Sequence, residues 1–167
     1  TRFAPIYDAD GACIPTLYAA SSVECALHES LFHGVDPRAA FKSVRRDAVD
    51  MRAHSEIRAA KRMELVSLFR PDLMRWGLAR DDLVSALPKF YSATACWAEA
   101  IFRSFPRAQG LTWTSNRCDP DRAFVFFANR LDDDAWDVLS TRLAADDPAF
   151  LAEIVAAARR AGITIVK

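Results

Sequence analysis

Hydrophobic positions in the first part of the chain follow two periodicities. Residues 15–20 form a short apolar run, which predicts a buried strand. Apolar residues then recur at helical spacing over 23–33, and Gly34 follows as a stop signal. Either Ser21 or Ser22 can cap the start of that helix. The pattern therefore predicts a strand followed closely by a helix.

The rest of the chain continues to mix strand-like and helix-like segments. Strands are predicted at 40–49, 111–114, 123–128 and 163–166. Helices are predicted at 58–76, interrupted by Pro71 with Asp72 capping the second part, and at 92–105, 134–143 and 148–161. Because the strands are dispersed and do not alternate strictly with helices, the pattern indicates an α+β fold.

Composition and charge narrow the class of protein. A chain of 167 residues that is 51% hydrophobic fits one globular domain. Its 22 basic and 22 acidic side chains cancel, so no basic face for nucleic acid is expected. No apolar run approaches the roughly 20 residues that cross a bilayer. Direct binding to nucleic acid or to a membrane is therefore not predicted.

Several familiar motifs are missing from the sequence. With only five glycines, the chain contains neither GxGxxG nor GxxxxGK[ST], which disfavours a Rossmann-type dinucleotide site. No serine lies in a GxSxG elbow. His28 and His33 are five residues apart, about 140° around a helix, so they do not form the paired-histidine zinc motif. No metal is predicted.

The cysteines do not indicate a disulfide or a metal cross-link. None of the four forms a CxxC pair, and in a chain of this size free thiols in a reducing cytosol are expected. They are Cys13, Cys25, Cys96 and Cys118.

One set of separated motifs remains. It consists of the pair Arg2-Phe3, the run Leu-Tyr-Ala-Ala at 17–20, Glu29 eleven residues after Tyr18 with Ala26 between them, and Ser115-Asn116-Arg117. In order and spacing this set resembles the RES domain, which is named for its Arg, Glu and Ser. Asp50-Met51 also resembles a short segment of that family.

The resemblance implies a fold and an activity. The expected fold is like that of the ADP-ribosyltransferase toxins of the diphtheria type, with a split antiparallel β core flanked by helices. Residues 1–167 would form a single domain, and the strand that usually precedes the arginine would lie upstream. Such proteins consume NAD⁺ as toxins of type II toxin–antitoxin pairs in the bacterial cytoplasm. The implied partner is a helix-turn-helix antitoxin of the Xre type.

The motif residues suit cleavage of the bond between nicotinamide and ribose. Glu29 can stabilise an oxocarbenium-like transition state, and Ser115 can hold either that carboxylate or a ribose hydroxyl by a hydrogen bond. Arg2 suits the pyrophosphate, and Tyr18 offers a flat face to nicotinamide. Substrate binding is also expected of Phe3, Asn116 and Arg117. The sequence leaves open whether ADP-ribose passes to a protein, to water or to phosphate.

Taken singly, each of these residues has an ordinary explanation. Glu29 could be a solvated helix residue paired with His33, Tyr18 a core aromatic, and Ser115 part of a turn. Two alternatives therefore stand beside the enzyme. One is a catalytically silent RES-like module that binds the antitoxin. The other is an unrelated α+β domain.

Overall fold

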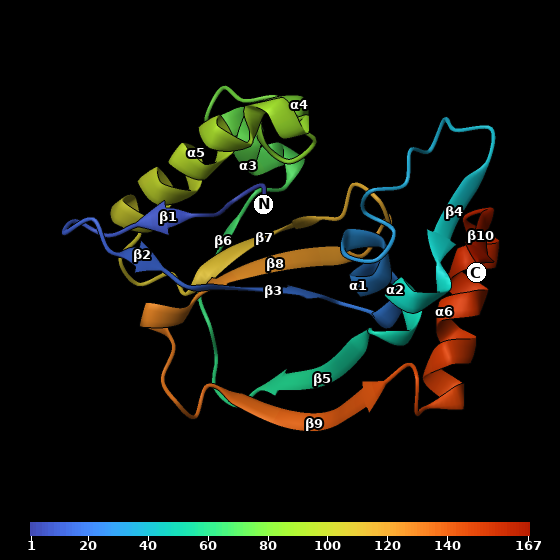
Figure 1. Cartoon of the computed structure of the whole chain (residues 1–167). Helices are drawn as coiled ribbons and strands as arrows, with labels where there is room; N and C mark the ends of the chain where they lie inside the picture. The colour runs from blue at the N-terminus through green and yellow to red at the C-terminus, as the bar shows by residue number, and fades with distance from the viewer.

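A four-stranded sheet occupies the centre of the molecule (Figure 1). The computed structural model describes residues 1–167. The sheet contains, in spatial order, β3 (Thr16–Ala20), β8 (Arg122–Phe127), β7 (Gly110–Thr114) and β6 (Leu65–Ser67). The first three strands are antiparallel, whereas β6 runs parallel to β7. β8 therefore lies between β3, which carries the predicted tyrosine, and β7, which leads into the predicted serine motif.

Three further strand pairs lie around the sheet. Two are antiparallel: β1 (Ile6–Tyr7) with β2 (Cys13–Ile14), and β5 (Ala53–Ala59) with β9 (Trp136–Leu143). The third is parallel, between β4 (Lys42–Arg45) and β10 (Ile163–Val166). In Figure 1 the β5–β9 pair lies on the side of the central sheet opposite α3, α4 and α5.

Helices on that upper side build the larger hydrophobic core. They are α3 (Arg70–Arg75), α4 (Arg80–Leu83) and α5 (Tyr91–Ser104). Short 3₁₀ turns at Pro88–Phe90 and Ala128–Arg130 complete the connections. Leu73, Leu83, Ile101, Leu111 and Val125 are all buried in one cluster, so apolar helix faces cover the sheet.

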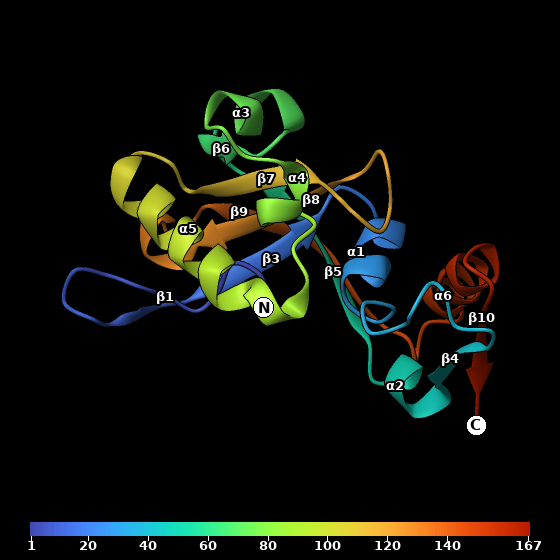
Figure 2. The same cartoon turned by 90° about the horizontal axis from the view of Figure 1, so that it is seen from above.

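A second core lies beside the sheet, where Figure 2 places α6 next to β10 and β4. It joins α1 (Val23–Glu29), α2 (Arg46–Asp50) and α6 (Pro148–Arg160) to these two strands. Phe32, Val49, Phe150 and Ile154 are buried in it. No helix of the chain is long and apolar enough to cross a membrane.

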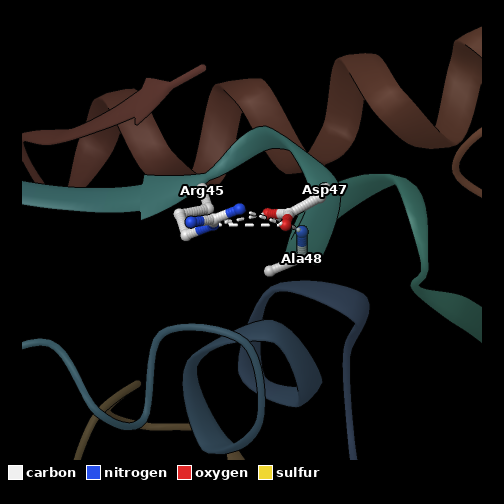
Figure 3. Close-up of polar contacts among 3 residues, drawn as sticks. All are labelled: Arg45, Asp47 and Ala48. Carbon is white, nitrogen blue, oxygen red and sulfur yellow. Dashed lines mark hydrogen bonds and ion pairs between the residues drawn. The ribbon is translucent and has the colours of Figure 1, made fainter.

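Short polar contacts fix the local turns. At the start of α2 the Arg45 guanidinium donates to the Asp47 carboxylate, with Nη2 2.6 Å from Oδ2, and the Ala48 amide donates to Asp47 Oδ1 (Figure 3). These hydrogen bonds, the one from Arg45 first, lower the pKa of Asp47. The group is solvent-exposed, so it shapes the turn from β4 into α2 and adds little stability.

Several sequence predictions are confirmed by these elements. Ser22 caps α1 by accepting from the Cys25 amide at 3.1 Å. The predicted helices at 92–105 and 148–161 correspond to α5 and α6. The predicted strands at 111–114, 123–128 and 163–166 correspond to β7, β8 and β10.

Two helix predictions were wrong. The segment 134–143 is instead a turn followed by the strand β9, which begins at Trp136. Asp132 and Asp134 both bind Lys61 in this turn and do not begin a helix. Most of the predicted helix at 58–76 is strand and turn, with only α3 helical. Asp72 does not cap that helix but accepts a hydrogen bond from Ser67 at 2.5 Å.

Three other predictions need adjustment. The helix predicted over 23–33 ends at Glu29, and the strand predicted over 40–49 divides into β4 and α2. The strand at 15–20 is present but is not buried, since 40% of Leu17 and 38% of Tyr18 are exposed. These two residues line a cleft, which is the reason for their exposure.

Candidate active site

A large cleft opens between the central sheet and the β5–β9 pair. Its volume is about 1190 Å³, at or above the upper end of the roughly 300–1,000 Å³ of small-molecule sites. The N-terminal residues, β3, α1, β5 and β9 all contribute to its wall. Among the lining residues are Arg2, Tyr18 and Glu29, so three of the four predicted catalytic side chains reach one cavity.

Glu29 is held in this cleft by Ser115. The serine is fully buried directly after β7, and its hydroxyl donates to Glu29 Oε1 at 2.7 Å. The backbone amides of Arg117 and Cys118 donate to the same hydroxyl oxygen at 3.1 and 3.0 Å. Because these amides occupy its lone pairs, the hydroxyl proton points at the carboxylate. The expectation that Ser115 touches Glu29 is therefore met geometrically.

Tyr18 anchors the N-terminal segment. Its hydroxyl accepts from the Phe3 amide and donates to Thr1 Oγ1, both at 3.1 Å. Phe3 is completely buried against Trp113, with ring centroids 4.9 Å apart. The Thr94 hydroxyl donates to the Arg2 carbonyl from α5. Arg2 is thus fixed on both sides although it lies near the start of the chain.

The Arg2 side chain forms no salt bridge within the chain. Its guanidinium lies over the Tyr91 ring, 5.7 Å from the centroid. Its Nε is buried and has no hydrogen-bond partner. A buried, unpartnered donor is costly unless something satisfies it, and this one belongs to a side chain that lines the cleft. The arrangement favours an anionic ligand beside Arg2.

Burial also shifts the ionisation of side chains in the cleft. It raises the pKa of Tyr18, whose hydroxyl faces the N-terminal segment while its ring borders the cleft. The pKa of His33 is lowered, first by burial and then by the nearby Arg117 charge. Both residues are consequently neutral near pH 7, and the charges available to a ligand are those of Arg2 and the acidic groups.

The predicted substrate-binding residues lie elsewhere. Phe3 is in the core and cannot reach a ligand, so it serves as an anchor for Arg2. Asn116 and Arg117 are not part of the cleft wall. Asn116 accepts from Ser85 at 3.0 Å, and the Arg117 amide supports Ser115. None of the three side chains is part of the cleft wall.

Some cleft residues carried no sequence signal. Tyr91 begins α5, His54 and Glu56 lie on β5, and Trp136 begins β9. The indole nitrogen of Trp136 is buried without a hydrogen-bond partner. The segments containing Glu56 and Trp136 come together only through the β5–β9 pairing, which the sequence reading had missed.

The fold and the cleft define a mixed α+β protein with a serine-held carboxylate and an unpaired arginine in one cavity. The RES domain family matches residues 2–159 of the 167 residues, and the chain belongs to that family. RES domains are associated with toxin–antitoxin systems, with antitoxin partners and with NAD-utilising activity. Comparison with curated proteins and with solved structures gave no match.

Proposed function

We propose that this protein is the toxin of a type II toxin–antitoxin pair and cleaves the nicotinamide–ribose bond of NAD⁺. The observation that carries the proposal is the hydrogen bond from Ser115 Oγ to Glu29 Oε1 in a cleft that also contains Arg2. Sequence-distant residues converge there, and the family has NAD-utilising activity. An ADP-ribosyltransferase-like fold of the diphtheria type forms part of this proposal.

Glu29 supplies the electrostatic stabilisation. As nicotinamide leaves, positive charge develops on the ribose ring, and a fixed carboxylate beside that carbon lowers the barrier. Ser115 orients one carboxylate oxygen, which leaves the second free for the sugar or its hydroxyls. The serine itself is already engaged by two amides, so its role is to position Glu29.

Arg2 and Tyr18 bind two different groups of NAD⁺, the pyrophosphate and the nicotinamide ring. The guanidinium of Arg2 can donate to the pyrophosphate, which would satisfy its buried Nε. The exposed face of Tyr18 offers a surface for nicotinamide. The cavity is large enough for a dinucleotide.

The proposal includes an acceptor and a partner. ADP-ribose passes to a protein side chain, to water or to phosphate after nicotinamide leaves. A helix-turn-helix antitoxin of the Xre type binds the toxin and covers the cleft. DNA binding is left to that antitoxin, in keeping with the formal net charge of zero.

Nicotinamide release from NAD⁺ by the purified chain tests the reaction. We expect Glu29→Gln to lower kcat by at least about 100-fold, the size of effect seen when a preorganised electrostatic group is removed. Glu24→Gln is the matched control, because Glu24 lies on the same helix but pairs with Arg160 at 2.8 Å outside the cleft. No release by wild type would leave the silent binding module as the better explanation. Equal release by wild type and Glu29→Gln would remove the catalytic role from Glu29.

A second experiment identifies the acceptor. NAD⁺ labelled in its adenylate part is incubated with the chain in a cell lysate, and proteins are separated from small molecules. Label on a discrete protein band indicates transfer to protein. Label found solely in small molecules indicates hydrolysis or phosphorolysis, and omitting phosphate separates these two. The Glu29→Gln variant should abolish either product.

A further inference from the structure

Three metal-ligating groups that are not part of the cleft wall lie close together near Ser115. They are Cys25 on α1, Cys118 in the loop after β7, and Asp121 just before β8. One ligand atom from each lies within 4.8 Å of the other two. The two cysteines are distant in sequence and form no CxxC motif, so only the packing of α1 against the loop brings them together.

We propose that Cys25, Cys118 and Asp121 form a binding site for a thiophilic divalent metal ion of the Zn²⁺ class. Two thiolates and one carboxylate are ligands that Zn²⁺ accepts, and three protein ligands leave a fourth tetrahedral position for water. The site is separate from the histidine pair His28 and His33, whose spacing argues against a zinc motif.

The spacing of Cys118 and Asp121 suits such an ion. Bond lengths of about 2.3 Å to sulfur and about 2.1 Å to oxygen, at a tetrahedral angle, place a sulfur and an oxygen ligand roughly 3.6 Å apart. Cys118 Sγ lies 3.7 Å from Asp121 Oδ2. The pair is therefore already spaced for a shared ion, without movement of the backbone.

Neighbouring hydroxyls orient the carboxylate. Ser21 Oγ donates to Asp121 Oδ1 at 2.9 Å, and Ser22 Oγ donates to Asp121 Oδ2 at 2.7 Å. Metal-bound carboxylates in proteins are held by hydrogen bonds of this kind. Cys25 is fully buried while Cys118 and Asp121 are half-buried, so an ion reaches the site from the side of the loop.

Metal binding converts both thiols to thiolates. As the two Zn–S bonds form, the proton of each Cys sulfur passes to the buffer, and no oxidant or reductant is needed. The Cys118 amide also supports Ser115 Oγ at 3.0 Å. A bound ion would therefore share the residue Cys118 with the serine that holds Glu29, although the binding itself does not depend on the proposed reaction.

The test uses the whole chain, reduced with a phosphine and freed of metal. Co²⁺ is added, and the thiolate-to-cobalt charge-transfer absorption is followed. Zn²⁺ is then added to displace Co²⁺. The affinity and stoichiometry of Zn²⁺ binding are measured by competition with a chelating dye. We expect one equivalent to bind to wild type. Cys13→Ser and Cys96→Ser are matched controls, since both cysteines are exposed and lie on β2 and α5, outside the cluster, and they should behave like wild type.

Three variants distinguish a site from chance proximity. Cys118→Ala should abolish the charge-transfer band and weaken Zn²⁺ binding by at least about 100-fold, and Ser21→Ala should weaken it by roughly 10-fold through the carboxylate. Because Cys25 is buried, Cys25→Ala is interpreted only alongside a native circular dichroism spectrum. Absence of the band in wild type, or its retention in folded Cys118→Ala, would overturn the proposal.

Discussion

At the residue scale the site depends on a few directed hydrogen bonds. The Ser115 hydroxyl, supported by two amides, fixes the orientation of Glu29. The Tyr18 hydroxyl and the buried Phe3 ring fix Arg2. Each functional side chain therefore has a positioning partner that is buried or bonded to the backbone.

Replacing Ser115 with alanine should affect both activity and stability. Glu29 loses its fixed orientation, and we expect kcat for nicotinamide release to fall by about 10- to 100-fold with a smaller change in KM. Two amide donors in the loop lose their acceptor, which should lower the free energy of unfolding by about 1–3 kcal/mol. Urea unfolding and steady-state kinetics measure the two effects.

The control for Ser115→Ala is Ser30→Ala. Ser30 also lines the cleft, but its hydroxyl donates to the Ala26 carbonyl and does not touch Glu29. We expect near wild-type kcat from this variant. If the two alanine variants turned over NAD⁺ equally, Ser115 would not be positioning the carboxylate.

Arg2 should not be replaceable by lysine. Lysine keeps the positive charge but loses the forked donor set and the planar contact with Tyr91. We expect Arg2→Lys to raise KM for NAD⁺ by roughly 10-fold, which corresponds to about 1.4 kcal/mol of binding. Arg38→Lys, at an exposed position, is the comparison. An unchanged KM in Arg2→Lys would remove the pyrophosphate role from this residue.

At the element scale, close packing of β7 against β8 supports the site. Ser115 directly follows β7, and α1 ends at Glu29. The position of β7 relative to α1 therefore sets the distance between the Ser115 and Glu29 side chains. Local signals predicted both elements and the Ser22 cap of α1, although α1 ends at Glu29 and not at residue 33. They failed for β9, where Asp134 belongs to a turn bound by Lys61.

Gly110 tests the packing of β7 on β8. A side-chain carbon at this position would meet the Val125 carbonyl oxygen at clashing distance and lie 3.0 Å from Phe126 Cα. Both are backbone atoms, so strand separation is the only relief. We expect Gly110→Ala to lower the free energy of unfolding by about 1–3 kcal/mol, measured by urea denaturation.

Gly34→Ala provides the reference for that measurement. An added carbon at Gly34 meets nothing within 4 Å, and the backbone there does not require glycine. This variant should unfold like wild type. Comparable destabilisation by the two changes would show that the tight contact at Gly110 can relax.

At the scale of the whole molecule, His54 connects the β5–β9 pair to the second core, through Phe150. It lies on β5 and packs against Phe150 of α6, with ring centroids 5.5 Å apart and the ring planes tilted by 35°. Its Nδ1 is 3.3 Å from Arg142 Nη2 on β9. Burial first, and then the Arg142 charge, lower the pKa of His54, whereas Glu153 and Glu56 act in the opposite direction. The folded protein therefore favours neutral His54.

This shift predicts a loss of stability in mild acid. The unfolded chain regains an ordinary histidine pKa near 6.5 and so binds more protons than the folded chain as the pH falls through that value. The free energy of unfolding should decrease from pH about 7.5 to pH about 5.5. His54→Gln should reduce this decrease without removing it, because the pKa of His28 and of His33 is also lowered by burial. An identical pH dependence in the variant would contradict the role given to His54.

Motif order and local pattern along the chain were sufficient to predict the family, the α+β class and most of the local elements. Arg2, Tyr18, Glu29 and Ser115 could be selected because motif order and spacing are properties of the chain alone. Caps, glycine stops and apolar periodicity are local as well, which is why α1, α5, α6 and β7 were predictable.

Only the tertiary structure decided where those residues meet. The 2.7 Å contact between Ser115 and Glu29, the burial of Phe3 and the convergence of Cys25 with Cys118 depend on strand pairing and helix packing over long separations in sequence. Strand pairing is a non-local choice, and so β5 with β9, and the cleft wall they form, had no signal along the chain. The tyrosine strand proved exposed for the same reason, since burial is set by what packs on a strand and not by its composition.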